Sequence, residues 1–343
     1  MKENKIWRLT LDTNPEDCNL QCIMCEEHSE YSDFKQRLFE QTGIKRRVMP
    51  REWLENIFLQ AKELGVREII PSTMGEPLLY KYFDDILELA EKYNIKINLT
   101  TNGTFPRRSA KEWAEKIVPV TSDTKFSVNG ATAQTAENIM KRLSFEHQMA
   151  GIKTFINVRD KYYSETGQYS RVSFQLTFMR NNMHELEDII RMAAGMGVDR
   201  IKGHHLWTHF PEIEDLSFKC CPDAIEEWNR IVKRAYEAAD KYRRPDGSKI
   251  LLEQIYPLEH KETEEVPYEY ECPFLGKELW ISAMGKISPC CAPDELRNRL
   301  GDFGNIQNRR LMEVIQSPEY IHLKKTYKEH PVCKTCVMRK PVS

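Results

Sequence analysis

Three cysteines near the start of the chain have the spacing of a metal centre. Cys18, Cys22 and Cys25 follow the pattern Cys-x3-Cys-x2-Cys, in a chain that holds ten cysteines in all. Three thiolates at this range can bind three irons of a cubane [4Fe–4S] cluster and leave the fourth iron for an outside ligand. A structural zinc site instead closes with four protein ligands, and His28 is the nearby candidate for the fourth. The spacing therefore predicts either an open iron–sulfur cluster or a closed zinc site.

Five more cysteines lie in the last quarter of the chain and form a second group. Four of them have the arrangement of a metal site: Cys272, Cys290, Cys333 and Cys336. The first two flank a predicted hairpin that turns at Gly285, and the last two form a Cys-x2-Cys pair. Such a set can bind either zinc or a second [4Fe–4S] cluster, and the spacing alone does not decide between them. The fifth, Cys291, is interpreted as a bystander thiol.

A regular alternation of predicted strands and helices must position these cysteines. Alternating or apolar runs predict six strands, at residues 6–13, 66–71, 95–100, 124–128, 172–179 and 198–203. Helical spacing predicts helices at 51–64, 81–93, 108–117 and 183–196, and one long or broken helix over 131–163. This order predicts an α/β fold of parallel βα units, which form either a partial barrel or an open doubly wound sheet.

Parallel βα units gather the polar groups that follow their strands at one edge of the sheet. Here those groups are the first cysteine loop, Gly75-Glu76, Asn102, Asn129 and His204-His205. After residue 216 the alternation stops, and an amphipathic helix at 222–243 and a charged connection at 244–270 follow. We therefore predict a βα domain over 1–216, a helical connection over 217–271 and a small cysteine-rich domain over 272–343.

Four short motifs resemble those of a known family. Residues 18–25, CNLQCIMC, are similar to the cluster-binding loop of the radical S-adenosylmethionine (SAM) superfamily. Three later turns resemble that family's SAM-binding turns: MGEP at 74–77, TNG at 101–103 and SVNG at 127–130. Met74 and Asn129 stand where the family has glycine and aspartate. The resemblance implies a partial (β/α)6 TIM-like barrel in which a [4Fe–4S] cluster cleaves SAM to a 5′-deoxyadenosyl radical, which then abstracts a hydrogen atom.

The resemblance also implies roles for individual residues. Cys18, Cys22 and Cys25 would bind the first cluster. The residues implied in SAM binding are Gly75, Glu76, Asn102, Ser127 and Asn129. Gln175, in the fifth predicted strand, is expected either to face the SAM ribose or to be a satisfied core glutamine.

The pattern Cys-x12-Gly-x4-Cys with a distant Cys-x2-Cys is similar to the SPASM/twitch extension of the same superfamily, in its shorter twitch form. This second resemblance implies a small C-terminal twitch/SPASM domain with an auxiliary [4Fe–4S] cluster. The implied ligands of that cluster are Cys272, Cys290, Cys333 and Cys336. A cluster with four protein ligands has no open iron, so it is expected to accept or relay an electron.

Four further side chains are candidates for catalytic roles: His204, His205, Cys220 and Cys221. The histidines follow the sixth predicted strand and either orient a polar substrate and shuttle a proton or make only local hydrogen bonds. One of the two cysteines would donate a hydrogen atom in an epimerase, and the alternative is that both are buried thiols. The polar connection over 26–50 is long enough for a lid, and its basic run over 45–47 is interpreted as a solvated face.

Charge and hydropathy restrict the partners and the location of the protein. The chain has 50 Lys+Arg and 52 Asp+Glu, and its net charge of −2 gives no electrostatic argument for nucleic acid or an anionic membrane. No apolar run is long enough for a membrane span. Because the start of the chain also lacks a secretory signal, we expect a cytoplasmic protein with free thiols.

The predicted function is that of a radical SAM oxidoreductase. The expected substrate is a small polar or sugar-like molecule, because the first barrel strand begins almost at once and leaves no separate peptide-recognition domain. The expected electron donor is a flavodoxin or ferredoxin. The alternatives are a radical enzyme that modifies a short peptide, an epimerase and, in another class, a zinc-stapled binding protein that does not use SAM.

Overall fold

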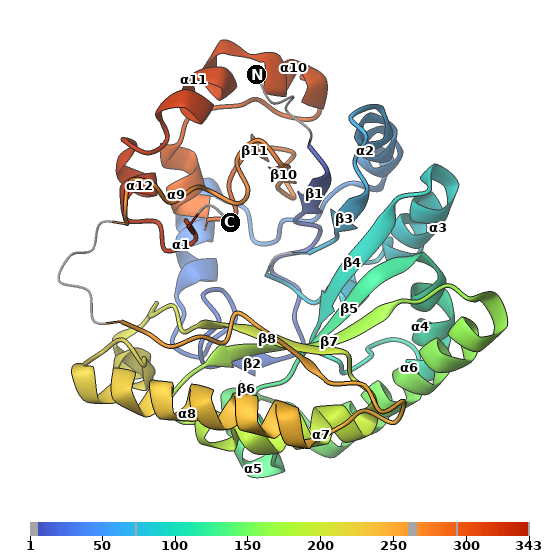
Figure 1. Cartoon of the computed structure of the whole chain (residues 1–343). Helices are drawn as coiled ribbons and strands as arrows, with labels where there is room; N and C mark the ends of the chain where they lie inside the picture. The colour runs from blue at the N-terminus through green and yellow to red at the C-terminus, as the bar shows by residue number, and fades with distance from the viewer. Residues whose placement is uncertain (1–5, 73, 260–265, 293, 342–343) are drawn as a thin grey trace.

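The computed structural model describes residues 6–72, 74–259, 266–292 and 294–341, and in this part of the chain the main feature is a curved sheet of nine strands (Figure 1). The spatial order of the strands is β11-β10-β1-β3-β4-β5-β7-β8-β9. Their bounds are β1 (Arg8–Leu11), β3 (Glu68–Ile70), β4 (Lys96–Thr101), β5 (Thr121–Ser127), β7 (Arg171–Phe178), β8 (Arg200–His205), β9 (Leu251–Glu253), β10 (Glu278–Ile281) and β11 (Ile287–Ser288). Neighbouring strands run parallel except in the β10–β11 hairpin.

The six predicted strands are β1, β3, β4, β5, β7 and β8, which lie side by side in the middle of the sheet. Helices follow these strands and cover the convex face of the sheet in Figure 1. They are α2 (Arg51–Glu63), α3 (Phe83–Tyr93), α4 (Ala110–Ile117), α6 (Phe145–Thr166), α7 (Leu186–Met196) and α8 (Pro222–Lys241). The predicted alternation of strand and helix is confirmed, and with it the partial (β/α)6 barrel.

Each barrel strand has an apolar and a polar face because successive side chains of a strand point to opposite sides. The apolar side chains are fully buried against the helices and include Leu9, Ile69, Ile97, Phe126, Phe174 and Ile201. The polar side chains between them line the inside of the barrel and include Arg8, Glu68, Asn98, Lys125, Gln175 and Lys202. A closed eight-stranded barrel fills its interior with branched apolar residues, whereas this partial barrel encloses charged groups.

The helix predicted over 131–163 is broken, and the break contacts the first cysteine loop. Helix α5 (Ala133–Ile139) ends in the two-residue strand β6 (Met140–Lys141), after which α6 begins. Strand β6 pairs in antiparallel fashion with β2 (Gln21–Cys22), with Cys22 opposite Met140. The interruption of the helix therefore supplies the backbone partner that holds the cysteine loop against the barrel.

The hairpin predicted between Cys272 and Cys290 is present as β10 and β11. Gly285 has a φ of 81° at its turn, a conformation that glycine adopts without steric cost. Strand β10 pairs in parallel with β1, so the hairpin extends the barrel sheet. Four helices follow the hairpin: α9 (Asp294–Arg299), α10 (Leu311–Gln316), α11 (Pro318–Thr326) and α12 (Pro331–Lys334). They lie at the β10–β11 end of the sheet, opposite α7 and α8 in Figure 1, and the Leu311 N–H of α10 donates to Gln60 Oε1 of α2 at 2.8 Å.

Two segments outside the predicted elements also take regular structure. The charged connection after α8 contributes β9, which pairs in parallel with β8 through Lys202 and Glu253. The polar connection before α2 contains α1 (Phe34–Thr42). Among the residues that the structure describes, no helix is long and apolar enough to cross a membrane.

Candidate functional site

The three cysteines of the first group lie together at the C-terminal end of β1. Cys18, Cys22 and Cys25 line a cavity of about 290 Å³, here called the cysteine cavity. Burial, with a smaller contribution from the negative charge of Glu76, raises the pKa of Cys18 to about 12. Burial also raises the pKa of Cys22 and of Cys25. Buried thiols that face one cavity ionise readily only when a metal cation compensates their charge, so this donor set fits an iron–sulfur cluster.

The placement of these thiols suits a cubane cluster better than a single ion. Among the described residues, no three cysteine, histidine or acidic side chains converge on one metal-ion position. Zinc, with Zn–S bonds of about 2.3 Å, needs such convergence, whereas three cysteines of a cubane bind three different irons. The proposed fourth zinc ligand, His28, uses both ring nitrogens elsewhere, on Pro15 O at 2.7 Å and Lys35 Nζ at 3.2 Å. These contacts argue against the zinc alternative at this site.

Buried ion pairs fasten the connection before α2 to the cysteine loop. Arg47 is only 7% exposed, and its Nη2 lies 2.5 Å from Glu16 Oε1 and 3.2 Å from Glu27 Oε1. Glu16 and Glu27 flank the three cysteines in sequence, so one cation holds both ends of the loop. The interpretation of residues 45–47 as a solvated face is therefore wrong for Arg47. Helix α1 in the same connection buries none of its residues.

Glu76 joins the two turns that follow β3 and β4. Its buried carboxylate accepts hydrogen bonds from the Leu78 N–H at 3.1 Å, the Thr101 hydroxyl at 2.7 Å and the Asn102 N–H at 2.8 Å. Burial outweighs these bonds and raises the pKa of Glu76 to about 7. Most of the hydrogen-bond acceptor positions of the carboxylate are occupied by protein donors, and these bonds fix the backbone of both turns at the cavity wall.

Only glycine fits at position 75. A Cβ atom there would collide with the carbonyl oxygen of Asn14 and would lie 2.9 Å from that of Asp17. The Glu76 N–H donates to Asp17 O at 2.7 Å, and Asn14 Nδ2 donates to Glu76 O at 3.0 Å. The turn after β3 and the loop that leads to Cys18 therefore touch backbone to backbone.

The other residues predicted to bind SAM line the same cavity: Asn102, Ser127, Asn129 and Gln175. Asn102 Nδ2 donates to Asn19 Oδ1 at 2.9 Å, which ties the turn after β4 to the cysteine loop. Asn129 Oδ1 accepts a hydrogen bond from the Thr177 N–H at 2.8 Å. These contacts brace the cavity wall from three strand ends.

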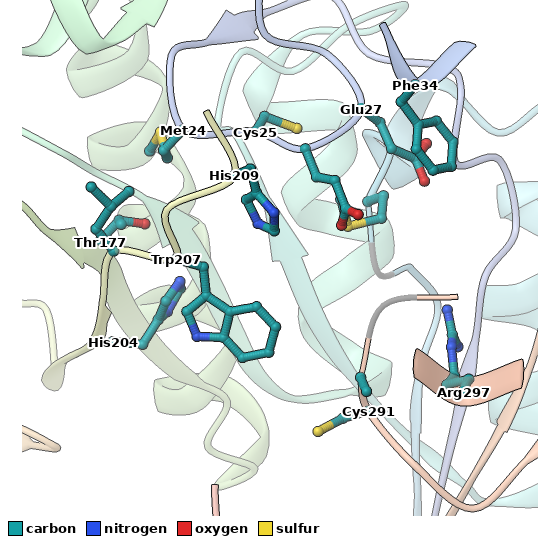
Figure 2. A pocket seen from close by; sticks show the side chains of 14 residues that line it. Met24, Cys25, Glu27, Phe34, Thr177, His204, Trp207, His209, Cys291 and Arg297 are labelled. Carbon is teal, nitrogen blue, oxygen red and sulfur yellow. The ribbon is translucent and has the colours of Figure 1, made fainter. Parts of the chain in front are cut away.

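His204 lies where three cavities meet. Besides the cysteine cavity, it lines a mouth cavity of about 240 Å³ with Trp207, His209 and Cys291 (Figure 2). It also lines a barrel cavity of about 630 Å³, whose polar lining comes from the inward faces of the strands. Gln175 Nε2 lies 3.5 Å from His204 Nδ1. The surrounding protein and the charge of Lys202 lower the pKa of His204 to about 4, so its ring is neutral at pH 7.

The structure does not bring the other three predicted catalytic side chains to these cavities. His205 packs on the opposite face of the sheet, with ring centroids 5.4 Å from Phe178 and 4.8 Å from Trp228. Cys220 and Cys221 are exposed at the start of α8, with their sulfur atoms 3.6 Å apart. The alternation of strand β8 explains the difference between the histidines, because it points His204 inward and His205 outward.

The C-terminal cysteines form a second group of thiols beside the hairpin. Burial raises the pKa of Cys333 to about 12, and the negative charges of Cys290, Cys336 and Cys272 contribute to this rise. Burial also raises the pKa of Cys272 and Cys336, and the charge of Cys290 adds to the rise in both. The thiols therefore lie near enough for their charges to act on one another, which fits four ligands that bind different irons of a cluster.

Cys291 faces the cavities beside this group. It lines both the mouth cavity and the barrel cavity (Figure 2). A hydrogen bond between the two neighbouring thiols lowers the pKa of Cys290 and raises that of Cys291. In this pair Cys290 ionises more readily than Cys291, which suits Cys290 as a ligand and Cys291 as a thiol at the cavity wall.

The charged lining of the barrel cavity was not predicted from the sequence. It includes Asp123, Lys125, Arg200 and Lys202. A signal was present in the sequence. Lys125 and Lys202 each stand next to an apolar residue of a predicted strand, Phe126 and Ile201, and a charged residue that alternates with apolar ones in a strand indicates a polar-lined cavity. In folds of parallel βα units, functional residues are expected at the C-terminal ends of the strands. These charged residues lie one side-chain layer deeper in the barrel.

Comparison with known families matches both cysteine groups. A model of the radical SAM superfamily matches residues 15–193, more than half of the chain, and this range includes the first cysteine group. A model of the SPASM domain, described as an iron–sulfur cluster-binding domain, matches residues 272–337. That range includes all four cysteines predicted to bind the auxiliary cluster.

Related proteins agree with these matches. The tungsten-containing aldehyde ferredoxin oxidoreductase cofactor-modifying protein of Pyrococcus furiosus is 24% identical over 340 residues, which cover 94% of this chain and 85% of the relative. The crystal structure of Streptococcus suis SuiB bound to S-adenosylmethionine has a TM-score of 0.68 at 18% identity and covers 97% of this chain and 72% of SuiB. SuiB bound to the precursor peptide SuiA gives 0.67 at 17% identity, with 97% and 71% covered. At these identities the likeness to SuiB shows a shared fold.

Proposed function

This chain belongs to the radical SAM superfamily and carries a SPASM iron–sulfur domain, and we propose that it oxidises a small polar substrate held between its two iron–sulfur sites. It is an enzyme that uses a [4Fe–4S] cluster, SAM and an auxiliary iron–sulfur cluster. When bound, these cofactors supply a 5′-deoxyadenosyl radical that takes a hydrogen atom from the substrate, and an acceptor for the electron that the substrate radical then releases with a proton.

The cysteine cavity is the proposed site of the first cluster and SAM. Cys18, Cys22 and Cys25 would hold the cluster, which their shared cavity and their raised pKa values support. The walls that would hold SAM come from the turns after β3, β4 and β5, with Gly75, Glu76, Asn102, Ser127 and Asn129. The auxiliary cluster would take Cys272, Cys290, Cys333 and Cys336.

One observation carries the proposal: the cavities adjoin one another between the two cysteine groups. Gln175 and His204 line both the cysteine cavity and the barrel cavity. Cys291, next to Cys290, lines the barrel cavity from the C-terminal side. A substrate in the barrel cavity would therefore have SAM at one end and the auxiliary cysteines beside it. With four protein ligands the auxiliary cluster has no open iron, which favours electron acceptance over substrate binding.

The residues at this junction have assignable roles in the proposed reaction. His204 is neutral at pH 7 and would accept the proton that leaves the substrate during oxidation, or would position a substrate hydroxyl. Gln175 would orient the substrate through its amide. Cys291 and Arg297 of the C-terminal segment form part of the wall of the mouth cavity and would help to keep water and oxygen from the radical.

A second candidate substrate is a peptide. The observation behind it is the fold shared with SuiB, which has been crystallised with its precursor peptide SuiA. A peptide would enter through the mouth cavity, where Trp207 and His209 offer ring surfaces. The electron donor we propose is a flavodoxin or ferredoxin.

Metal counting on cysteine variants tests the assignment. After anaerobic reconstitution, the wild-type chain should hold about eight irons as two four-iron clusters and no zinc. Cys22→Ala/Cys25→Ala should lose about four irons and the dithionite-dependent formation of 5′-deoxyadenosine from SAM, whereas Cys333→Ala/Cys336→Ala should lose about four irons and still cleave SAM. Zinc at the C-terminal site would remove the proposed electron acceptor, and a wild-type chain that never cleaves SAM would overturn the whole proposal.

A further inference from the structure

The barrel cavity contains more positive than negative charge. Six cationic and three acidic side chains line it. The three acidic groups pair with only two arginines of the barrel wall. Arg8 Nη1 lies 3.2 Å from Glu68 Oε1, and Arg200 pairs with both Asp123 and Glu253. The cavity therefore keeps an excess of three positive charges, and the cations besides these two arginines are Lys125, Lys202, Lys340 and Arg171.

Lys125 is a buried cation in this cavity that lacks a hydrogen-bond or ion-pair partner among the described residues. Its side chain on β5 is only 8% exposed, and among the described residues its Nζ has no hydrogen-bond acceptor or ion-pair partner. Its neighbour in the cavity, Lys202 on β8, has only Glu253 Oε1 at 3.7 Å. Burial, and next the charge of Lys202, lower the pKa of Lys125 to about 8. Asp123 and Glu68 attract Lys125 only from beyond ion-pair distance. A buried cation with no carboxylate in direct contact costs folding free energy, so its presence calls for an anion that binds later.

We propose that Lys125 and Lys202 bind an anionic group, a phosphate or a carboxylate, of the enzyme's small-molecule substrate. This inference rests on the proposed function, since it places the substrate in the barrel cavity. Asn98 and Ser122 line the same cavity but donate to Glu68 at 3.0 and 2.7 Å, so the lysine ammonium groups supply the hydrogen bonds to such an anion. Paired charges and hydrogen bonds together make the kind of buried site in which an anion is held strongly.

The position of the lysines along their strands sets the length of the substrate. Lys125 precedes Ser127 by two residues on β5, and Lys202 precedes His204 by two residues on β8. Two residues of a strand span roughly 6.6 Å, so the anionic group would sit about one side-chain layer below the cysteine cavity. A small molecule with its anion on the lysines would thus reach Gln175 and His204 with its other end. The cavity of about 630 Å³ is large enough for such a molecule.

Thermal unfolding of the anaerobic, reconstituted enzyme tests the anion site without a known substrate. Inorganic phosphate and succinate, each titrated at constant ionic strength, serve as the two probes. A bound anion raises the melting temperature in proportion to RT ln(1 + [L]/Kd). We expect one of the probes to stabilise the wild-type chain, and its apparent Kd to rise at least about tenfold in Lys125→Met and in Lys202→Met.

The matched control is Lys111→Met, because Lys111 is an exposed lysine of α4 that faces only Glu115. This variant changes the net charge equally and should bind the probes as wild type does. Without anion, Lys125→Met should melt no lower than wild type, because it removes an unpaired buried charge. If Lys125→Met nevertheless fails to fold, Lys202→Met makes the same test with a less buried side chain.

The outcomes separate this inference from the proposed function. The control Lys111→Met should cleave SAM without substrate as wild type does, and loss of cleavage in the wild-type chain would count against the function and not against the anion site. A response to phosphate alone identifies a phosphate, and a response to succinate alone a carboxylate. No response to either anion, or an equal response in Lys125→Met, would overturn the inference.

Discussion

Replacing Gly75 by alanine should displace the cysteine loop while the barrel stays folded. The new methyl group would collide with Asn14 O and lie 2.9 Å from Asp17 O. Both carbonyls belong to the loop that leads directly into Cys18, and the Glu76 N–H holds Asp17 O at 2.7 Å. The two backbones must separate by roughly 1 Å before the contact ceases to be repulsive. Cys18 would move with them.

The cost of this displacement follows from the contacts that it breaks. Overpacking of a tight contact costs about 1–3 kcal/mol, and loss of the hydrogen bond from Glu76 to Asp17 adds about 1 kcal/mol. We therefore expect Gly75→Ala to lower the free energy of unfolding by about 2–4 kcal/mol. Because the strain acts on Cys18 alone among the cluster residues, the first site should bind less iron while the C-terminal site keeps its own.

Gly195→Ala is the matched control for this experiment. Gly195 lies inside α7, and a Cβ atom there would meet nothing within 4 Å. Alanine at this position should be neutral or should stabilise the helix by up to about 1 kcal/mol. Urea unfolding gives the free energies, and iron counting after anaerobic reconstitution gives the cluster content. Equal stability and equal iron content in the two variants would refute the backbone-contact argument.

Three further predictions concern side chains around the site. Arg47→Met should lower the free energy of unfolding by about 3–5 kcal/mol, because two buried carboxylates lose their cation. The control Arg46→Met, at an exposed position, should lower it by less than about 1 kcal/mol. Equal losses of unfolding free energy for the two variants in urea titrations would contradict the role of Arg47. Burial raises the pKa of Glu76 from 4.5 to about 7, so its protonated form stabilises the fold below pH 4.5, and that contribution is lost as the pH rises through 7. Glu76→Gln should flatten this part of the curve of unfolding free energy against pH, whereas parallel curves for variant and wild type would show that Glu76 titrates normally. The double variant Cys220→Ser/Cys221→Ser should keep wild-type iron content and SAM cleavage, since both thiols lie outside the cavities; a large loss of 5′-deoxyadenosine formation would restore them as candidates.

The barrel was predictable from sequence because its signals are local. The apolar face of each strand and the helical spacing between strands appear within short windows, and they gave the six parallel units correctly. The short strands β2, β6 and β9 were not predictable in this way. Each has two or three residues, and each exists only through pairing with a distant segment, such as Cys22 with Met140 or Lys202 with Glu253.

The site was predictable to the extent that its chemistry lies in contiguous motifs. The spacing of the two cysteine groups indicated iron–sulfur chemistry, and the family matches confirm the cofactors. The direction in which a single side chain points could not be predicted from these motifs. Whether His204 or His205 faces the cavity depends on the phase of β8, and the exposure of Cys220 and Cys221 depends on how α8 docks. That Lys125 has no ion-pair partner in the described part of the chain can be seen only once the other strands that line the barrel cavity are placed around it.

Electron paramagnetic resonance of the dithionite-reduced protein tests the central claim most directly, that two clusters sit on the two cysteine groups and only the first binds SAM. The wild-type chain should show two reduced-cluster signals, and added SAM should change one of them. That SAM-sensitive signal should be the one that remains in Cys333→Ala/Cys336→Ala and the one that disappears in Cys22→Ala/Cys25→Ala. A SAM-sensitive signal that survives loss of the first cysteine group, or a wild-type spectrum that SAM leaves unchanged, would contradict the account.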